Sequence, residues 1–169
     1  MNNSRINICF SKLKKEKKSA FIAFLTACDP SYSMSLKLLK AMPKVGVDII
    51  EIGMPFSDPM ADGTVIQRSY IRALKSGSSL TKTLNLVKSF RSTNKITPVV
   101  LMGYYNPILQ MGLKKFVNKA KASGVDGILI VDLPPEVSNE LSSELDPSKI
   151  DMIRLASPTT TIERMNNIL

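Results

Sequence analysis

The stretch VGVDIIEIGMPFSDP, residues 45–59, holds in order the features that decide the fold. Gly46 comes directly before a largely continuous apolar run, Val47 to Met54, and Pro55 and Pro59 follow that run. An apolar run of this length is typical of a strand buried on both faces in a parallel sheet. Glycine is common just after a helix, and proline is common where the next helix begins. The stretch therefore predicts one βα unit.

The same pattern recurs along the chain. Four other apolar runs have strand length: Ala20 to Ala27, Pro98 to Tyr104, Val125 to Asp132 and Asp151 to Ser157. The loops CDP, YNP, DLPP and SP follow them, and we expect proline at the first helical position with Asp, Asn or Ser as caps. Apolar residues at helical spacing predict six helices. These are marked by Leu36, Leu39 and Met42; Ile66, Tyr70 and Leu74; Leu80, Leu84 and Val87; Phe116, Val117 and Ala120; Val137 and Leu141; and Ile162 and Met165.

Strands that alternate with helices indicate parallel pairing with right-handed crossovers. An open doubly wound sheet and a (β/α)8 TIM barrel both fit this pattern. No G-x-G-x-x-G follows the first strand, which disfavours a dinucleotide-binding open sheet. A barrel typically needs about 250 residues, whereas this chain has five predicted strands. We therefore expect residues 1–169 to be a single α/β domain, the N-terminal portion of an incomplete (β/α)8 TIM barrel with about five βα units.

The composition limits the possible chemistry. The chain has no histidine, which excludes Ser-His-Asp and Cys-His pairs and ordinary histidine metal sites. Cys9 and Cys28 are too few and too isolated for a disulfide framework or a clustered metal site, so we expect two reduced thiols. No apolar run is long enough to span a membrane, and the first residues do not resemble a signal peptide. The expected location is the cytoplasm, or an organelle stroma if the protein is plastid-encoded.

Much of the net charge of +9 comes from lysines in the segment SKLKKEKKSA, residues 11–20. Such a segment could bind nucleic acid, but no aromatic residues interleave with the lysines for base stacking. Ile6, Phe10 and Leu13 recur at spacings of four and three, which is typical of an amphipathic helix that docks by one face. We therefore expect a docked helix whose lysines face solvent.

Glu51 lies in the second apolar run. Successive strand side chains point to opposite faces, so Ile50, Ile52 and Met54 share one face, while Glu51 and Gly53 share the other. We expect the apolar set to pack under helices and Glu51 to point into the barrel near its C-terminal mouth, where such enzymes place catalytic residues. Gly53 would leave space there for a ligand. Partial burial would raise the pKa of Glu51 from about 4.3, unless the glutamate pairs with a buried Arg or Lys.

Asp62 lies beyond this strand, in a loop with Pro55, Pro59 and Gly63. There it would remain solvated and ionised. Two carboxylates in unlike environments can divide acid and base roles.

The motifs together resemble one family. EIGMPFSDPMADGTVIQ, residues 51–67, is similar to the signature of the tryptophan synthase alpha chain. LTACDP, LMGYYNPI, GVDGILIVDLPPE and SPTT continue the resemblance in order over nearly the whole chain.

The resemblance implies a (β/α)8 barrel that cleaves indole-3-glycerol phosphate to indole and glyceraldehyde 3-phosphate by a retro-aldol reaction in tryptophan biosynthesis, with no cofactor in this chain. It implies that Glu51 is the acid-base residue that protonates the indole ring carbon and helps to remove the hydroxyl proton. Asp62 would bind the indole N–H and stabilise the developing positive charge. The implied indole pocket consists of Phe24, Met102, Tyr104, Leu129, Val131 and Leu155.

The resemblance also implies a partner. The loop with Asp58 would face a tryptophan synthase beta chain, which uses pyridoxal phosphate and receives indole in an alpha2beta2 tetramer. Two positions depart from the family pattern: Cys28 replaces a glycine, and Thr64 replaces a proline. The phosphate-holding loops of the family follow strands beyond the fifth. Two alternatives remain open: a truncated, non-catalytic chain that only docks on the beta chain, and a free-standing indole-3-glycerol phosphate lyase.

Overall fold

The computed structural model describes residues 4–168 and contains one parallel sheet. Its strands are β1 (Ile22–Thr26), β2 (Ile49–Gly53), β3 (Val99–Gly103), β4 (Gly127–Ile130) and β5 (Asp151–Ile153). They lie in the order β1-β2-β3-β4-β5, and each pairs in parallel with the next. Sequential parallel strands with helical crossovers are the arrangement of a TIM barrel, here with five of its strands. The predicted fold class is therefore confirmed.

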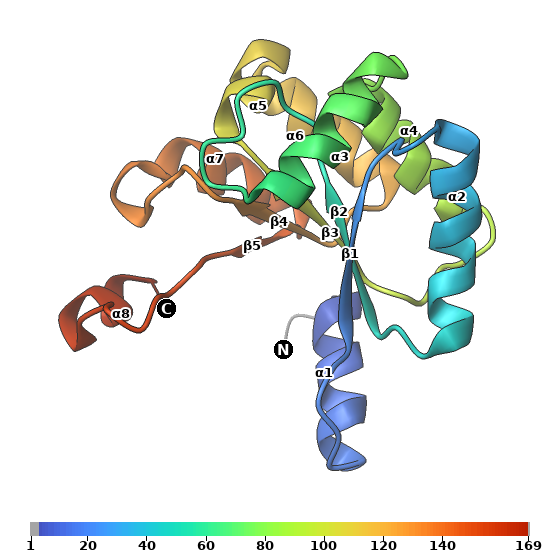
Figure 1. Cartoon of the computed structure of the whole chain (residues 1–169). Helices are drawn as coiled ribbons and strands as arrows, with labels where there is room; N and C mark the ends of the chain where they lie inside the picture. Colours follow the sequence, from blue (N-terminus) through green and yellow to red (C-terminus); the bar gives the residue numbers. More distant parts are fainter. Residues whose placement is uncertain (1–3, 169) are drawn as a thin grey trace.

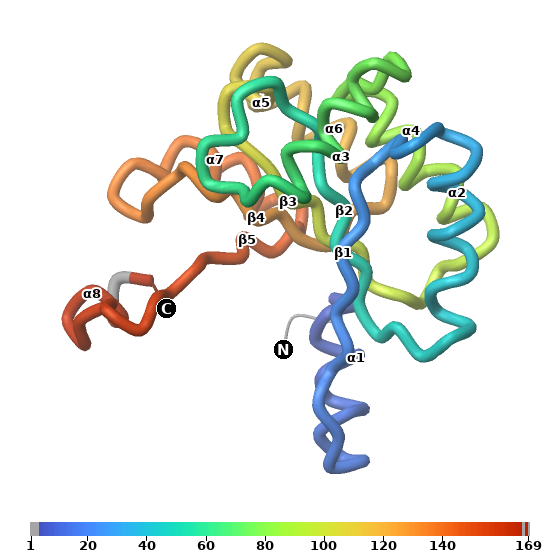
Figure 2. Tube along the Cα trace, in the orientation of Figure 1, coloured from blue at the N-terminus to red at the C-terminus, as the bar shows by residue number. Residues whose placement is uncertain are grey.

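The helices lie mainly on one side of this sheet. They are α1 (Arg5–Lys15), α2 (Tyr32–Ala41), α3 (Thr64–Lys75), α4 (Leu80–Arg91), α5 (Tyr105–Met111), α6 (Leu113–Ser123), α7 (Asn139–Leu145) and α8 (Ile162–Ile168), with short 3₁₀ helices at Met42–Val45, Pro135–Val137 and Asp146–Ser148. Figure 1 shows α1 apart from the others, near the end where the strands begin, and α8 projecting beyond β5. The tube in Figure 2 follows the same path. Within residues 4–168, no helix combines the length and apolarity needed to cross a bilayer.

The predicted helices exist, except that Val137 lies in the 3₁₀ helix Pro135–Val137 and is exposed, so that α7 begins only at Asn139. Their first turns also differ from the expectation. Pro30 precedes the N-cap of α2, and the side chain of Ser31 accepts a hydrogen bond from the Met34 N–H. Pro107 is the third residue of α5, a helix that the apolar spacing did not predict. Proline is tolerated throughout the first turn because those N–H groups have no partner within the helix. Gly46 follows a helix, as predicted, and both Gly46 and Gly124 end their helices in the left-handed conformation.

The core is divided by strand parity, as expected. Ile50, Ile52 and Met54 belong to the large apolar cluster under the helices. A smaller cluster on the other face is built on Ile49, Val100 and Leu129. The fifth strand is shorter than its apolar run, since β5 ends at Ile153.

Helix α1 docks on the smaller cluster. Ile6 and Cys9 pack against it, and Leu13 is buried, whereas Phe10 is 47% exposed. The lysines of residues 12–18 are all exposed. The amphipathic-helix prediction is therefore confirmed, except that the docked face runs through Cys9 rather than Phe10.

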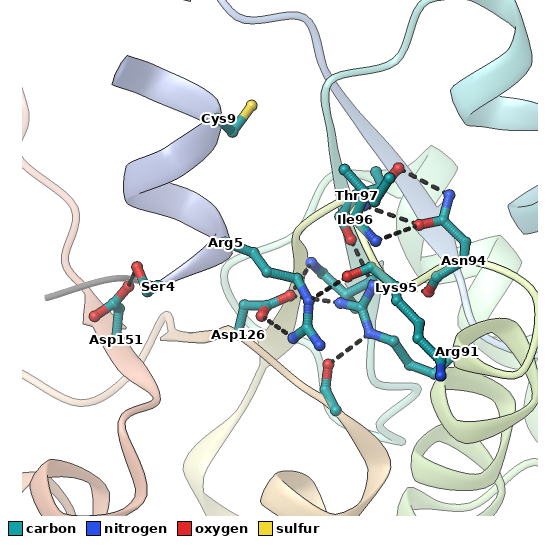
Figure 3. Close-up of polar contacts among 12 residues, drawn as sticks. Ser4, Arg5, Cys9, Arg91, Asn94, Lys95, Ile96, Thr97, Asp126 and Asp151 are labelled. Carbon is teal, nitrogen blue, oxygen red and sulfur yellow. Dashed lines mark hydrogen bonds and ion pairs between the residues drawn. The ribbon is translucent and has the colours of Figure 1, made fainter. Parts of the chain in front are cut away.

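A buried charge network joins α1 to the starts of two strands (Figure 3). Asp126, just before β4, forms ion pairs with Arg91 of α4 and, at 2.7 Å, with Arg5 of α1. The same carboxylate accepts the Val99 N–H at 2.8 Å. Arg91 also donates to the carbonyl oxygen of Thr97 at 2.6 Å. Because one carboxylate serves three elements, this network fixes the N-terminal end of the sheet.

Candidate active site

Glu51 lies on the sheet face opposite the outer helices. Strand register places it between Phe24 of β1 and Val100 of β3. Its side chain is half-buried, and burial raises the pKa of its carboxyl group above the ordinary value. Within residues 4–168 no cation forms an ion pair with it. Among the described residues, therefore, Glu51 is not neutralised by a buried Arg or Lys.

Asp62 lies on the loop after β2 and contacts the end of β3. The Tyr104 hydroxyl donates to Asp62 Oδ2 at 2.7 Å and accepts the Ala61 N–H at 2.9 Å. Burial, and to a smaller extent the hydrogen bond to Asp62, raise the pKa of Tyr104 to about 12, so this hydroxyl stays protonated and remains a donor. The Phe56 ring lies 5.3 Å from the Tyr104 ring, centroid to centroid. These contacts hold the loop against β3.

The space expected beside Gly53 is filled by other side chains. A Cβ atom built on Gly53 would lie 2.5 Å from Cζ of Phe24 and 3.2 Å from the hydroxyl oxygen of Tyr70. The missing side chain therefore admits a phenylalanine ring and a tyrosine, and the prediction of free ligand space at Gly53 is wrong. The strand pattern could not reveal this, because Phe24 and Tyr70 come from β1 and α3.

Most of the six pocket residues lie on one face and at one end of the sheet. Met102 and Leu129 are register partners on β3 and β4. Phe24 and Val131 are partly buried and Tyr104 is buried, whereas Leu155 is 62% exposed beyond the end of β5. Leu155 is therefore the one member that the described residues leave uncovered.

The two departures from the family pattern have local consequences. Cys28 is buried and has φ +63°, the left-handed conformation that glycine adopts most easily. Thr64 is the first residue of α3, and its N-cap, Gly63, has no side chain to accept a hydrogen bond, so the helix begins there without proline.

Asp58, the residue expected to face a partner, is exposed on the loop after β2 and accepts a hydrogen bond from Ser57 Oγ.

One further side chain, Tyr70, belongs to this region, because its hydroxyl lies beside Gly53. Tyr104, already expected in the pocket, also contributes its hydroxyl, which donates to Asp62. In the sequence, Tyr70 is only one apolar position of a helix, so nothing in the pattern marked it. Among the described residues, no group of three Cys, Asp or Glu side chains converges as metal ligands.

Sequential parallel strands, helices on the outer face and carboxylates at the C-terminal strand ends define the class of (β/α)8-barrel enzymes. A family model described as tryptophan synthase alpha chain matches residues 10–169. The chain belongs to the tryptophan synthase alpha chain family, whose members are lyase-type enzyme subunits.

Solved structures agree with this assignment. The tryptophan synthase alpha subunit of Legionella pneumophila is 44% identical, with a TM-score of 0.95 over 98% of this chain and 63% of that chain. A structure of the tryptophan synthase α2β2 complex of the hyperthermophile Pyrococcus furiosus contains a chain with 46% identity and a TM-score of 0.84, covering 88% of this chain and 63% of that one. The chain thus spans somewhat less than two thirds of the length of these relatives.

Proposed function

We propose that this chain contributes the acid-base centre for cleavage of indole-3-glycerol phosphate to indole and glyceraldehyde 3-phosphate. The observation that carries the proposal is the environment of Glu51. It is half-buried on the inner sheet face, its pKa is raised, and no described cation pairs with it. A carboxyl group whose pKa is raised in this way holds its proton more readily than an exposed one, which suits it to general acid-base catalysis.

The second carboxylate has a different role. Asp62 accepts the Tyr104 hydroxyl in a more polar setting at the same end of the sheet. In our proposal its carboxylate accepts the indole N–H and stabilises the positive charge that develops when Glu51 protonates the ring carbon. Phe24, Met102 and Leu129 would line the indole site, with Tyr104, Val131 and Leu155 at its outer end.

The test measures indole release by two proteins. One is the 169-residue chain, and the other is a chimera in which the part of the Legionella pneumophila alpha chain beyond the match follows residue 169. Glu51→Gln in the chimera should lower kcat by about 100-fold or more, since general acid-base groups contribute about 10² to 10⁴. Asp62→Asn should also depress turnover. Unchanged turnover in Glu51→Gln would remove the assignment.

We further propose a tryptophan synthase beta chain as partner, in an alpha2beta2 tetramer. The loop after β2 supports this, because Asp58 and the apolar Met60 are both exposed on it. Pyridoxal phosphate would belong to that beta chain, and this chain would use no cofactor of its own. The cytoplasm is the proposed location, as for a biosynthetic enzyme.

Mixing with a beta chain distinguishes the partnered enzyme from the two alternatives. The partnered enzyme should form a larger complex in sedimentation and release indole faster in it. A chain that only docks would form the complex but release no indole. A free-standing lyase would release indole at the same rate with and without the beta chain.

A further inference from the structure

Tyr70 has a buried hydroxyl without a partner. The side chain is 1% exposed, and no described residue donates to or accepts from its oxygen. Burying a hydroxyl without a hydrogen bond costs about 1–3 kcal/mol. Phenylalanine would fill the same space without this cost, so the hydroxyl is unexplained by packing.

The helix around Tyr70 is anchored on both sides. Ser69 Oγ and Thr26 Oγ1 are 2.6 Å apart in a hydrogen bond. Arg72 forms two hydrogen bonds with the Asp29 carboxylate, at 2.9 and 2.7 Å. These bonds hold the part of α3 that carries Tyr70 against the C-terminal end of β1.

That place is the candidate active site. The hydroxyl oxygen lies 3.2 Å from the position of a Cβ atom on Gly53, two residues beyond Glu51 on the same face. Burial raises the pKa of Tyr70, with further contributions from Asp62, Tyr104 and Glu51. The hydroxyl thus stays protonated and remains a hydrogen-bond donor in a site that contains two carboxylates.

Asp62 has an oxygen that this donor could use. Tyr104 donates to Asp62 Oδ2, and no described residue donates to Oδ1. A carboxylate has about four lone-pair sites, so it can accept two phenols and a ligand N–H together. Asp62 lies on the loop that follows β2, and the Tyr70 hydroxyl lies beside Gly53, the last residue of β2, so both groups are at the C-terminal end of the same strand.

We infer that Tyr70 is a positioning residue for Asp62: in the ligand-bound site its O–H donates to the Asp62 carboxylate, beside Tyr104, and directs that carboxylate toward the indole N–H. This inference rests on the proposed function. Two phenol donors restrict rotation of the carboxylate, and donors to an anion form stronger bonds than donors to a neutral acceptor. The indole ring is then recognised by an acceptor that is oriented before the reaction begins.

The test is binding of indole to the 169-residue chain, followed by indole fluorescence, because the chain has no tryptophan. Tyr70→Phe removes only the hydroxyl and should raise the Kd for indole about 10-fold, while Tm stays equal or rises. Tyr32→Phe is the matched control. It removes a hydroxyl bonded to Ser89 Oγ at 2.9 Å on the outer helices, so Tm should fall while Kd is unchanged.

A further pair of variants tests whether Tyr70 acts through Asp62. In an Asp62→Ala background, Tyr70→Phe should cause no additional loss of affinity. An unchanged Kd in Tyr70→Phe, or an equal loss in the Asp62→Ala background, overturns the inference. If Asp62→Ala weakens binding and Tyr70→Phe does not, the proposed function stands and only the inference fails. If the unsubstituted chain does not bind indole, the proposed indole site fails, and the inference fails with it.

Discussion

Asp126→Asn should destabilise the chain more than any surface ion-pair variant. The substitution keeps the shape of the side chain but removes the charge that faces Arg91, whose side chain is 9% exposed. Burial already lowers the pKa of Arg91 to about 10, with Asp126 acting in the opposite direction. Breaking a buried pair leaves an uncompensated charge and costs about 3–5 kcal/mol. That is a large part of the roughly 5–15 kcal/mol that stabilises a domain.

The matched control is Asp29→Asn. Asp29 also pairs with an arginine, at 2.7 Å, but the side chain of Arg72 is 55% exposed. Exposed pairs contribute about 0–1 kcal/mol and weaken with salt. Urea unfolding followed by circular dichroism, at low and high NaCl, measures both variants. Equal free-energy losses in the two variants, within about 0.5 kcal/mol, would refute the argument that burial of the network determines its contribution.

Two predictions concern the site itself. The pKa of Glu51 is higher in the folded chain than in the unfolded chain, so ionisation of this carboxyl group opposes folding. The free energy of unfolding is therefore greatest below the unfolded-state pKa and falls as pH rises through the folded-state pKa. Glu51→Gln should therefore increase the free energy of unfolding at pH 7 to 8 and change it little below about pH 4; an equal effect at both pH values contradicts the assignment. Gly53→Ala should destabilise by about 1–3 kcal/mol, because its Cβ atom would lie 2.5 Å from the Phe24 ring. Thermal unfolding tests this, with Gly63→Ala as a control that meets no atom within 4 Å.

The sequence predicted elements better than their ends. Runs such as Val47–Met54 identified strands, because burial on both faces leaves a continuous apolar signature. The helix Tyr105–Met111 was missed, since seven residues with an internal proline are too short for a helical period to stand out. The last run extended to Ser157 in the prediction, while β5 ends at Ile153, because apolar composition alone does not require a strand.

The candidate site, too, was predicted only in part from the sequence. The face of Glu51 followed from strand parity, because alternation is a property of the local backbone. The filled space at Gly53 did not follow, since Phe24 and Tyr70 reach it from other elements. The roles of Glu51 and Asp62 stay predictions until turnover is measured in variants.

By itself, the sequence determined the alternation of strands and helices, the inward face of Glu51 and membership of the tryptophan synthase alpha chain family. These follow from local periodicity and from motifs whose residues are adjacent in the chain. Only the tertiary structure decided that Tyr104 donates to Asp62, that the Tyr70 hydroxyl is buried without a partner, and that Asp126 joins α1 to the sheet. Such contacts join residues far apart in the chain, and their geometry is set when the elements pack, so no local pattern contains it.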